Sequence, residues 1–78
     1  MNYVDKHALV LGLGESGLAM AQWLVHCGAR VRVADTRNEE AVAGRLAVLR
    51  AVAAESEFVG GKALSAGLLD GIDFVAVS

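Results

Sequence analysis

"VLGLGESGLAMAQWLVHCGARVRVADTR" occupies residues 10–37 and contains the most informative pattern of this chain. An apolar segment at its start runs directly into glycines spaced G-x-G-x-x-G, at Gly12, Gly14 and Gly17. A segment with a wide apolar face comes next, followed by a β-branched segment that ends at Asp35. Strand, glycine turn, helix and strand in this order predict a βαβ unit, in which the glycine loop lies at the amino end of the helix.

Elements of the same kinds continue beyond this stretch. We predict strands over residues 7–11, 30–34, 57–61 and 73–78, and helices over residues 17–27 and from Asn38 to about residue 54. Residues 62–71 are expected to form a loop with one short helix. Short connections and buried strands predict an α/β fold with a parallel sheet. The expected architecture is a Rossmann-like open sheet, β-α-β-α-β-(α)-β, in a single truncated domain that makes up half or more of a doubly wound fold.

The spacing of apolar residues predicts which helix faces are buried. The positions expected to face the core are Leu18, Ala21, Trp23, Leu24 and Val25 on the first helix and Val42, Leu46, Leu49 and Val52 on the second. Arg45 and Arg50 lie on the second helix and are expected to face solvent.

Composition excludes several classes of protein. The chain has 78 residues, is 55% hydrophobic and has a net charge of -2 with scattered Lys and Arg, which argues against a nucleic-acid or anionic-membrane surface. The single Cys27 excludes an internal disulfide and fits a reducing compartment, and the start of the chain does not resemble a signal peptide. His7 and His26 lack a third ligand for a metal. We therefore expect a cytoplasmic domain without a metal site, and the apolar run that stops at Ser78 predicts a fragment of a longer protein.

The glycine loop has the composition of a diphosphate site. Gly12 permits the turn, Gly14 removes a side chain where a phosphate must approach, and Gly17 lets the helix pack against the strand. Free N–H groups and the positive end of the helix dipole face the loop. The Ser16 hydroxyl either donates to a phosphate oxygen or caps the helix.

Asp35-Thr36-Arg37 places polar groups at the carboxyl end of a strand, where open α/β sheets bind ligands. Asp35 either accepts hydrogen bonds from ribose hydroxyls or forms an Asx turn, and Arg37 either meets a phosphate or base edge or is a solvated charge. By pattern alone, the NAD(P)-binding domain of an oxidoreductase or regulatory protein is favoured. A Rossmann-like module that binds nothing is the third interpretation.

The segments "VLGLGESGLAMAQWL", "GARVRVADTR" and "DFVAVS" together resemble the amino-terminal domain of the D-glutamate-adding members of the Mur ligase family, which act in peptidoglycan synthesis. The resemblance covers nearly the whole chain and is most specific in the G-L-G-x-[ST]-G loop and the D-T-R triplet. It implies that residues 1–78 form a UDP-binding domain rather than a dinucleotide-binding one, with UDP-N-acetylmuramoyl-L-alanine as the ligand. The implied contacts are Gly14, Glu15, Ser16 and Gly17 beside the diphosphate, Asp35, Thr36 and Arg37 around the uridine, and Ser78 in a turn that also touches the nucleotide.

The resemblance also implies that the chemistry takes place elsewhere. In the family, ATP and Mg²⁺ act in a central domain and D-glutamate binds to a C-terminal one, and this chain contains no G-x-x-x-x-G-K-[ST]. No catalytic residue is therefore predicted within these 78 residues. The Glu15 side chain is expected to turn outward, because a carboxylate aimed into the loop would repel the ligand.

Overall fold

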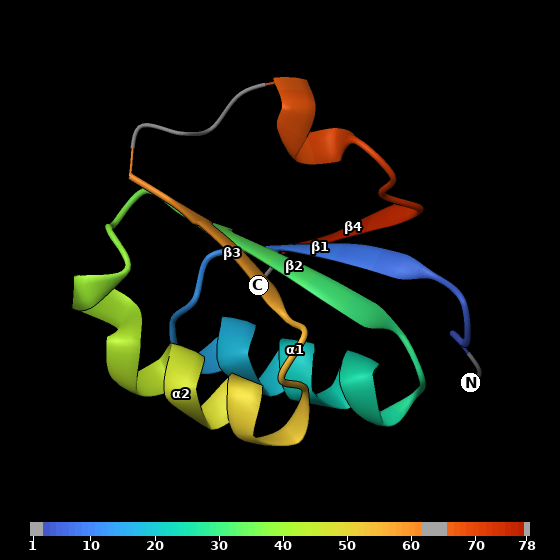
Figure 1. Ribbon diagram of the computed structural model, residues 1–78, viewed down its shortest axis with the longest axis horizontal. Coiled ribbons are helices and arrows are strands. Elements are labelled where there is room, and N and C mark those ends of the chain that lie inside the picture. The colour runs from blue at the N-terminus through green and yellow to red at the C-terminus, as the bar shows by residue number, and fades with distance from the viewer. Residues whose placement is uncertain (1–2, 62–65, 78) are drawn as a thin grey trace.

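The computed structural model describes residues 3–61 and 66–77, and its centre is a four-stranded parallel sheet (Figure 1). The strands are β1 (His7–Leu11), β2 (Arg30–Asp35), β3 (Glu57–Gly60) and β4 (Phe74–Val77). They lie in the order β3-β2-β1-β4, and every pair of neighbours is parallel. The predicted α/β class with a parallel sheet is confirmed.

Helices cover one side of this sheet, as Figure 1 shows. These helices are α1 (Glu15–His26) and α2 (Ala43–Val52), and a short 3₁₀ helix, η1 (Glu40–Val42), leads directly into α2. A second 3₁₀ helix, η2 (Ala66–Leu69), lies on the opposite side, within the segment that connects β3 to β4 (Figure 1). The connection therefore crosses from one edge of the sheet to the other, past β2 and β1.

Two predicted helix boundaries differ from the structure. The first helix begins at Glu15 rather than Gly17, with Gly14 as its N-cap. The second is divided, because the backbone of Val42 (φ -116°, ψ 12°) departs from helical geometry between η1 and α2. The N-cap of η1 is Glu39 rather than the predicted Asn38, although the Asn38 side-chain oxygen accepts a hydrogen bond of 3.0 Å from the Ala41 N–H.

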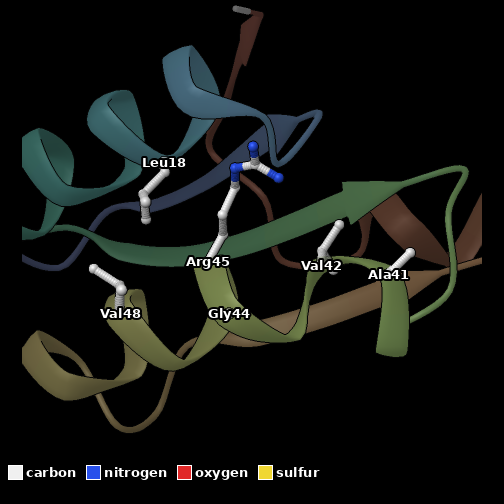
Figure 2. Close-up of a pocket in the computed structure, with 6 residues that line it drawn as sticks. All are labelled: Leu18, Ala41, Val42, Gly44, Arg45 and Val48. Carbon is white, nitrogen blue, oxygen red and sulfur yellow. The ribbon is translucent and has the colours of Figure 1, made fainter.

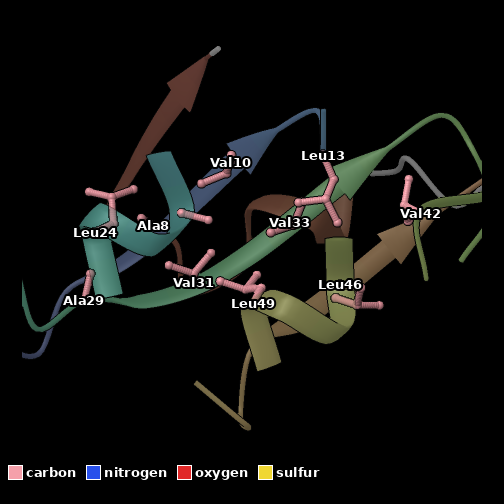
Figure 3. Packing of buried hydrophobic residues seen from close by; sticks show 11 residues of the cluster. Ala8, Val10, Leu13, Leu24, Ala29, Val31, Val33, Val42, Leu46 and Leu49 are labelled. Atoms are coloured by element: carbon pink, nitrogen blue, oxygen red, sulfur yellow. The ribbon is translucent and has the colours of Figure 1, made fainter. Parts of the chain in front are cut away.

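The hydrophobic core lies between the sheet and the two long helices (Figure 3). Alternate strand residues point toward the helices, as the pleat requires. The buried residues that meet in this layer include Ala8, Val10, Val31 and Val33 from the strands and Ala21, Leu24, Leu46 and Leu49 from the helices. The predicted core faces were right for these helix positions.

Two predicted core residues lie outside this layer. Trp23 is 49% exposed and Val52 is 60% exposed. On α1 the buried residues are Gly17, Ala21 and Leu24. Trp23 lies beside this stripe, where its ring meets that of Tyr3 edge-on with 6.0 Å between the ring centroids. A helix that covers one face of a sheet buries only the stripe that touches it, so a wide apolar face overestimates the core.

Candidate functional site

The strand order places the glycine loop at the point where the sheet changes direction. From β1 the chain moves to β2 and β3 on one side, and β4 then returns to the other side of β1. In open α/β sheets, ligands bind at the carboxyl ends of the strands at such a switch point. The loop that follows β1 is therefore the first place to look for a site.

Two hydrogen bonds tie this loop to the end of β2. Gly12, which has a φ of 92°, donates its N–H to the Ala34 carbonyl oxygen at 2.7 Å. Leu13 donates its N–H to Asp35 Oδ2 at 2.8 Å, while its side chain is fully buried in the core. The positive φ at Gly12 favours glycine, and the buried Leu13 side chain anchors the turn from below.

The mouth of α1 is open at Gly14. No side chain of the described residues caps the helix, and the first N–H that bonds back along the chain is that of Leu18, at 2.9 Å from the Gly14 oxygen. Within residues 3–61 and 66–77, the N–H groups of Glu15, Ser16 and Gly17 have no acceptor. In the part of the chain that the structure describes, no heavy atom other than those of the chain neighbours would lie within 4 Å of a Cβ built on Gly14. Three backbone donors at the start of α1 are therefore without an acceptor in the described part of the chain, and both Glu15 and Ser16 are exposed.

Asp35 is buried at the end of β2, with its side chain only 5% exposed. Oδ1 accepts the Arg37 backbone N–H at 2.8 Å and Arg37 Nε at 2.9 Å. Oδ2 accepts the Leu13 N–H at 2.8 Å and Arg37 Nη2 at 2.7 Å. The Asx turn that the sequence left open as an alternative is present in the bond from the Arg37 N–H to Oδ1.

These contacts determine the charge state of the carboxyl group. The hydrogen bond from the Arg37 side chain holds the pKa of Asp35 well below its ordinary value, and it outweighs burial, which acts in the opposite direction. The Leu13 and Arg37 backbone N–H groups add to the lowering of this pKa. The same ion pair raises the pKa of Arg37. Asp35 is therefore an anion in the folded protein, and its negative charge is neutralised by its own loop.

A hollow of about 470 Å³ opens beside this network. Its walls combine the end of β1 with the D-T-R triplet, and the residues that line it are Leu11, Gly12, Ala34, Asp35, Thr36 and Arg37. Thr36 is exposed, and the Arg37 side chain is 46% exposed although it is bonded to Asp35. The structure thus brings the D-T-R triplet together with the start of the glycine loop. Ser78, the last predicted contact, lies outside the described residues.

Sequence reasoning missed the bond from Leu13 to Asp35. It joins a backbone N–H to a side chain 22 positions later, and no residue type at either position signals it. In the described ranges no cluster of three or more His, Cys, Asp or Glu side chains is arranged for a metal ion. Within those ranges, too, no helix has the length and apolar character needed to cross a membrane.

Comparison with known proteins shows which family this chain resembles. It matches the family described as "Mur ligase MurD-like, N-terminal domain" over residues 6–78. It is 54% identical over 70 residues to the UDP-N-acetylmuramoylalanine–D-glutamate ligase of Ralstonia nicotianae, covering 90% of this chain and 13% of that one. It is 56% identical over 72 residues to the enzyme of the same name from Cupriavidus pinatubonensis, covering 92% and 14%.

The enzyme of that name from Aromatoleum aromaticum is 55% identical over 73 residues, which are 94% of this chain and 15% of that one. The chain thus spans 13% to 15% of the length of these relatives. Comparison with solved structures gave no significant match. Because the family match covers nearly every residue, the chain belongs to the family of MurD-like N-terminal domains of Mur ligases.

Proposed function

We propose that this chain binds the uridine diphosphate part of UDP-N-acetylmuramoyl-L-alanine, as the N-terminal substrate domain of a cytoplasmic D-glutamate-adding ligase. The observation that carries the proposal is the open mouth of α1 at Gly14 next to the 470 Å³ hollow beside the D-T-R triplet. The family match and the printed names of the relatives support the same ligand.

The diphosphate would occupy the space at Gly14. The N–H groups of Glu15, Ser16 and Gly17 supply donors, and the helix dipole adds roughly half a positive charge at this end. The Ser16 hydroxyl is exposed and is a further donor. The Glu15 side chain is exposed too, which agrees with a carboxylate that stays out of the phosphate space.

The uridine would lie in the hollow beside Thr36 and Arg37. A carboxylate has roughly four lone-pair positions, and four donors already bond to that of Asp35. Asp35 therefore contributes to binding by holding the glycine loop and the Arg37 side chain in place. The same saturation weighs against the NAD(P) alternative, in which this carboxylate must accept the ribose hydroxyls.

The ligation itself is assigned to the parts of a longer ligase that this chain does not contain. ATP and Mg²⁺ do not fit the residues present, because the sequence has no ATP loop and the described residues have no group of metal ligands. We therefore assign this chain no catalytic residue, and propose that the central and C-terminal domains are its partners.

Titration of the ¹⁵N-labelled chain with UDP, UDP-N-acetylmuramoyl-L-alanine and NADH tests the proposal. We expect the uridine nucleotides to shift the amide signals of residues 14–17 and 35–37. Tighter binding of NADH than of UDP would establish the dinucleotide alternative instead. If none of the three ligands shifts these amide signals, the domain is a structural module that binds no nucleotide.

Gly14→Val tests the phosphate space directly. The Gly14 backbone has an ordinary extended φ of -88°, and a Cβ there meets no neighbour within 4 Å among residues 3–61 and 66–77, so the fold should accept valine. The added methyl groups would occupy the space above the free N–H groups, and we expect UDP affinity to fall by more than about tenfold. An unchanged circular dichroism spectrum is the control, and full UDP affinity in this variant would remove the glycine loop from the site.

A further inference from the structure

A second hollow lies between the first turns of α1 and α2 and has a volume of about 390 Å³ (Figure 2). The residues that line it are Leu18, Ala41, Val42, Gly44, Arg45 and Val48. Apart from Arg45, these side chains are apolar. The hollow therefore offers one charged group in an otherwise apolar setting.

The burial of Arg45 corrects the expectation that it faces solvent. Its side chain is half-buried rather than exposed, whereas Arg50 is exposed as predicted. A partly buried aliphatic stem limits where the guanidinium can go, because the stem lies against apolar surface while the charge stays near water. The position of this cation is thus restricted by the hollow.

Arg45 also differs from Arg32, Arg37 and Arg50 in the partners of its guanidinium. Arg32 bonds to the Leu68 and Asp70 carbonyl oxygens, and Arg37 and Arg50 each pair with a carboxylate. Across residues 3–61 and 66–77, no hydrogen bond or ion pair involves the Arg45 guanidinium. Its positive charge is therefore available to a ligand.

The guanidinium extends from α2 toward the end of α1 at which the chain enters that helix (Figure 2). Arg45 shares the hollow with Leu18, whose N–H bonds to the Gly14 oxygen at 2.9 Å. The hollow thus begins one helical turn from Gly14, where the diphosphate is proposed to bind. Arginine suits such a position, because its planar fork can donate two hydrogen bonds to one phosphate.

We infer that Arg45 is a second cationic contact for the diphosphate at the mouth of α1, an inference that rests on the proposed function. A diphosphate carries several negative charges, and the helix dipole supplies only about half a positive charge. The Arg37 charge is already neutralised by Asp35, and Glu15 in the first turn of α1 adds negative charge. Arg45 offsets this deficit from the neighbouring helix.

Arg45→Gln, compared with Arg30→Gln, tests this assignment with UDP and uridine as the probes. Arg30 begins β2, at the opposite end of the strands from the glycine loop; it is exposed, and no hydrogen bond or ion pair in the described part of the chain involves its side chain. We expect Arg45→Gln to weaken UDP binding about fivefold and to leave uridine binding unchanged, since only UDP carries phosphate. Arg30→Gln should change neither affinity, and Arg45→Lys should restore part of the UDP affinity.

The outcomes separate this inference from the proposed function. If the wild-type chain does not bind UDP, both fail. If it binds UDP but Arg45→Gln leaves that affinity unchanged, only the role of Arg45 is refuted. An equal loss for UDP and uridine would mean that Arg45 supports the fold, and an equal loss in Arg30→Gln would mean that net charge alone is responsible. Arg45→Gln and Glu15→Gln could also cause the same selective loss of UDP affinity. That result would mean that Arg45 acts by pairing with Glu15, and it would overturn the proposed contact between Arg45 and the diphosphate.

Discussion

Replacing Asp35 by alanine removes one carboxylate that joins the glycine loop to the end of β2. The Leu13 N–H would lose its acceptor at a place where its own side chain is fully buried. Leaving a buried donor unsatisfied costs about 1–3 kcal/mol. Solvent screens the other partner, the half-exposed Arg37 side chain, so the ion pair itself adds little. We therefore expect Asp35→Ala to lower the free energy of unfolding by about 2 kcal/mol at pH 7.

Urea unfolding followed by circular dichroism measures this loss. A chain of this size has a stability of about 4–12 kcal/mol, so a change of about 2 kcal/mol is well resolved. Arg37→Gln is the matched control, because it removes the ion pair and keeps the carboxylate that accepts the Leu13 N–H. It should cost clearly less than Asp35→Ala. Equal losses in the two variants, or no loss in Asp35→Ala, would refute the claim that the carboxylate anchors the loop.

The pH dependence of this difference gives a second test. The pKa of Asp35 is lowered in the folded state, so the unfolded chain takes up the proton first as the pH falls. The contribution of Asp35 is complete above the ordinary carboxyl pKa of about 3.9, and is lost as the pH falls toward the lower folded value. Wild type and Asp35→Ala should therefore converge in stability between about pH 4 and pH 2. A gap that stays constant over this range would contradict the claim that the ionised carboxylate of Asp35 stabilises the folded protein.

Four further substitutions test the packing by urea unfolding. Gly60→Ala should destabilise the fold by about 1–3 kcal/mol, because the new Cβ would lie 2.8 Å from the Arg37 carbonyl oxygen; wild-type stability would show that this backbone contact can relax. Gly44→Ala in α2 has open space around its Cβ and should add about 0.5 kcal/mol through helix propensity, so a loss would reveal a contact at that position. Leu49→Ala should lower the free energy of unfolding by about 2–5 kcal/mol because Leu49 is fully buried. Val52 is 60% exposed, so Val52→Ala should change this free energy by less than about 0.5 kcal/mol. Similar losses in the two variants would mean that the buried face of α2 is wrongly assigned.

Local patterns were sufficient to predict most of the fold. Apolar segments separated by glycine turns gave the order of strands and helices, and buried strands with short connections predicted a parallel sheet. The division of the second helix at Val42 was missed, since no Pro lies there and the nearby Gly44 falls inside α2. The exposure of Trp23 was missed as well, because residue type does not say which part of an apolar helix face touches the sheet.

The candidate site was predictable as a location but not as a network. The glycine spacing pointed to the mouth of α1, and the D-T-R triplet pointed to the end of β2; the structure places the triplet beside Gly12. Whether Asp35 is free for a ligand depends on which donors surround it. The bond from Leu13 and the two side-chain bonds from Arg37 show that it is occupied.

The amino-acid sequence alone was enough to predict the class of fold, which the structure confirms, and it also indicated the end of the sheet at which we propose that the ligand binds. These depend on the chain's own periodicity and on the backbone freedom of glycine, which are local properties. The folded structure was needed to show that four donors occupy the Asp35 carboxylate and that Arg45 lines a hollow. It was also needed to show that, among the described residues, nothing crowds Gly14 and no group pairs with Arg45. Each of these depends on groups from distant segments meeting in space, and residue order alone does not specify such contacts.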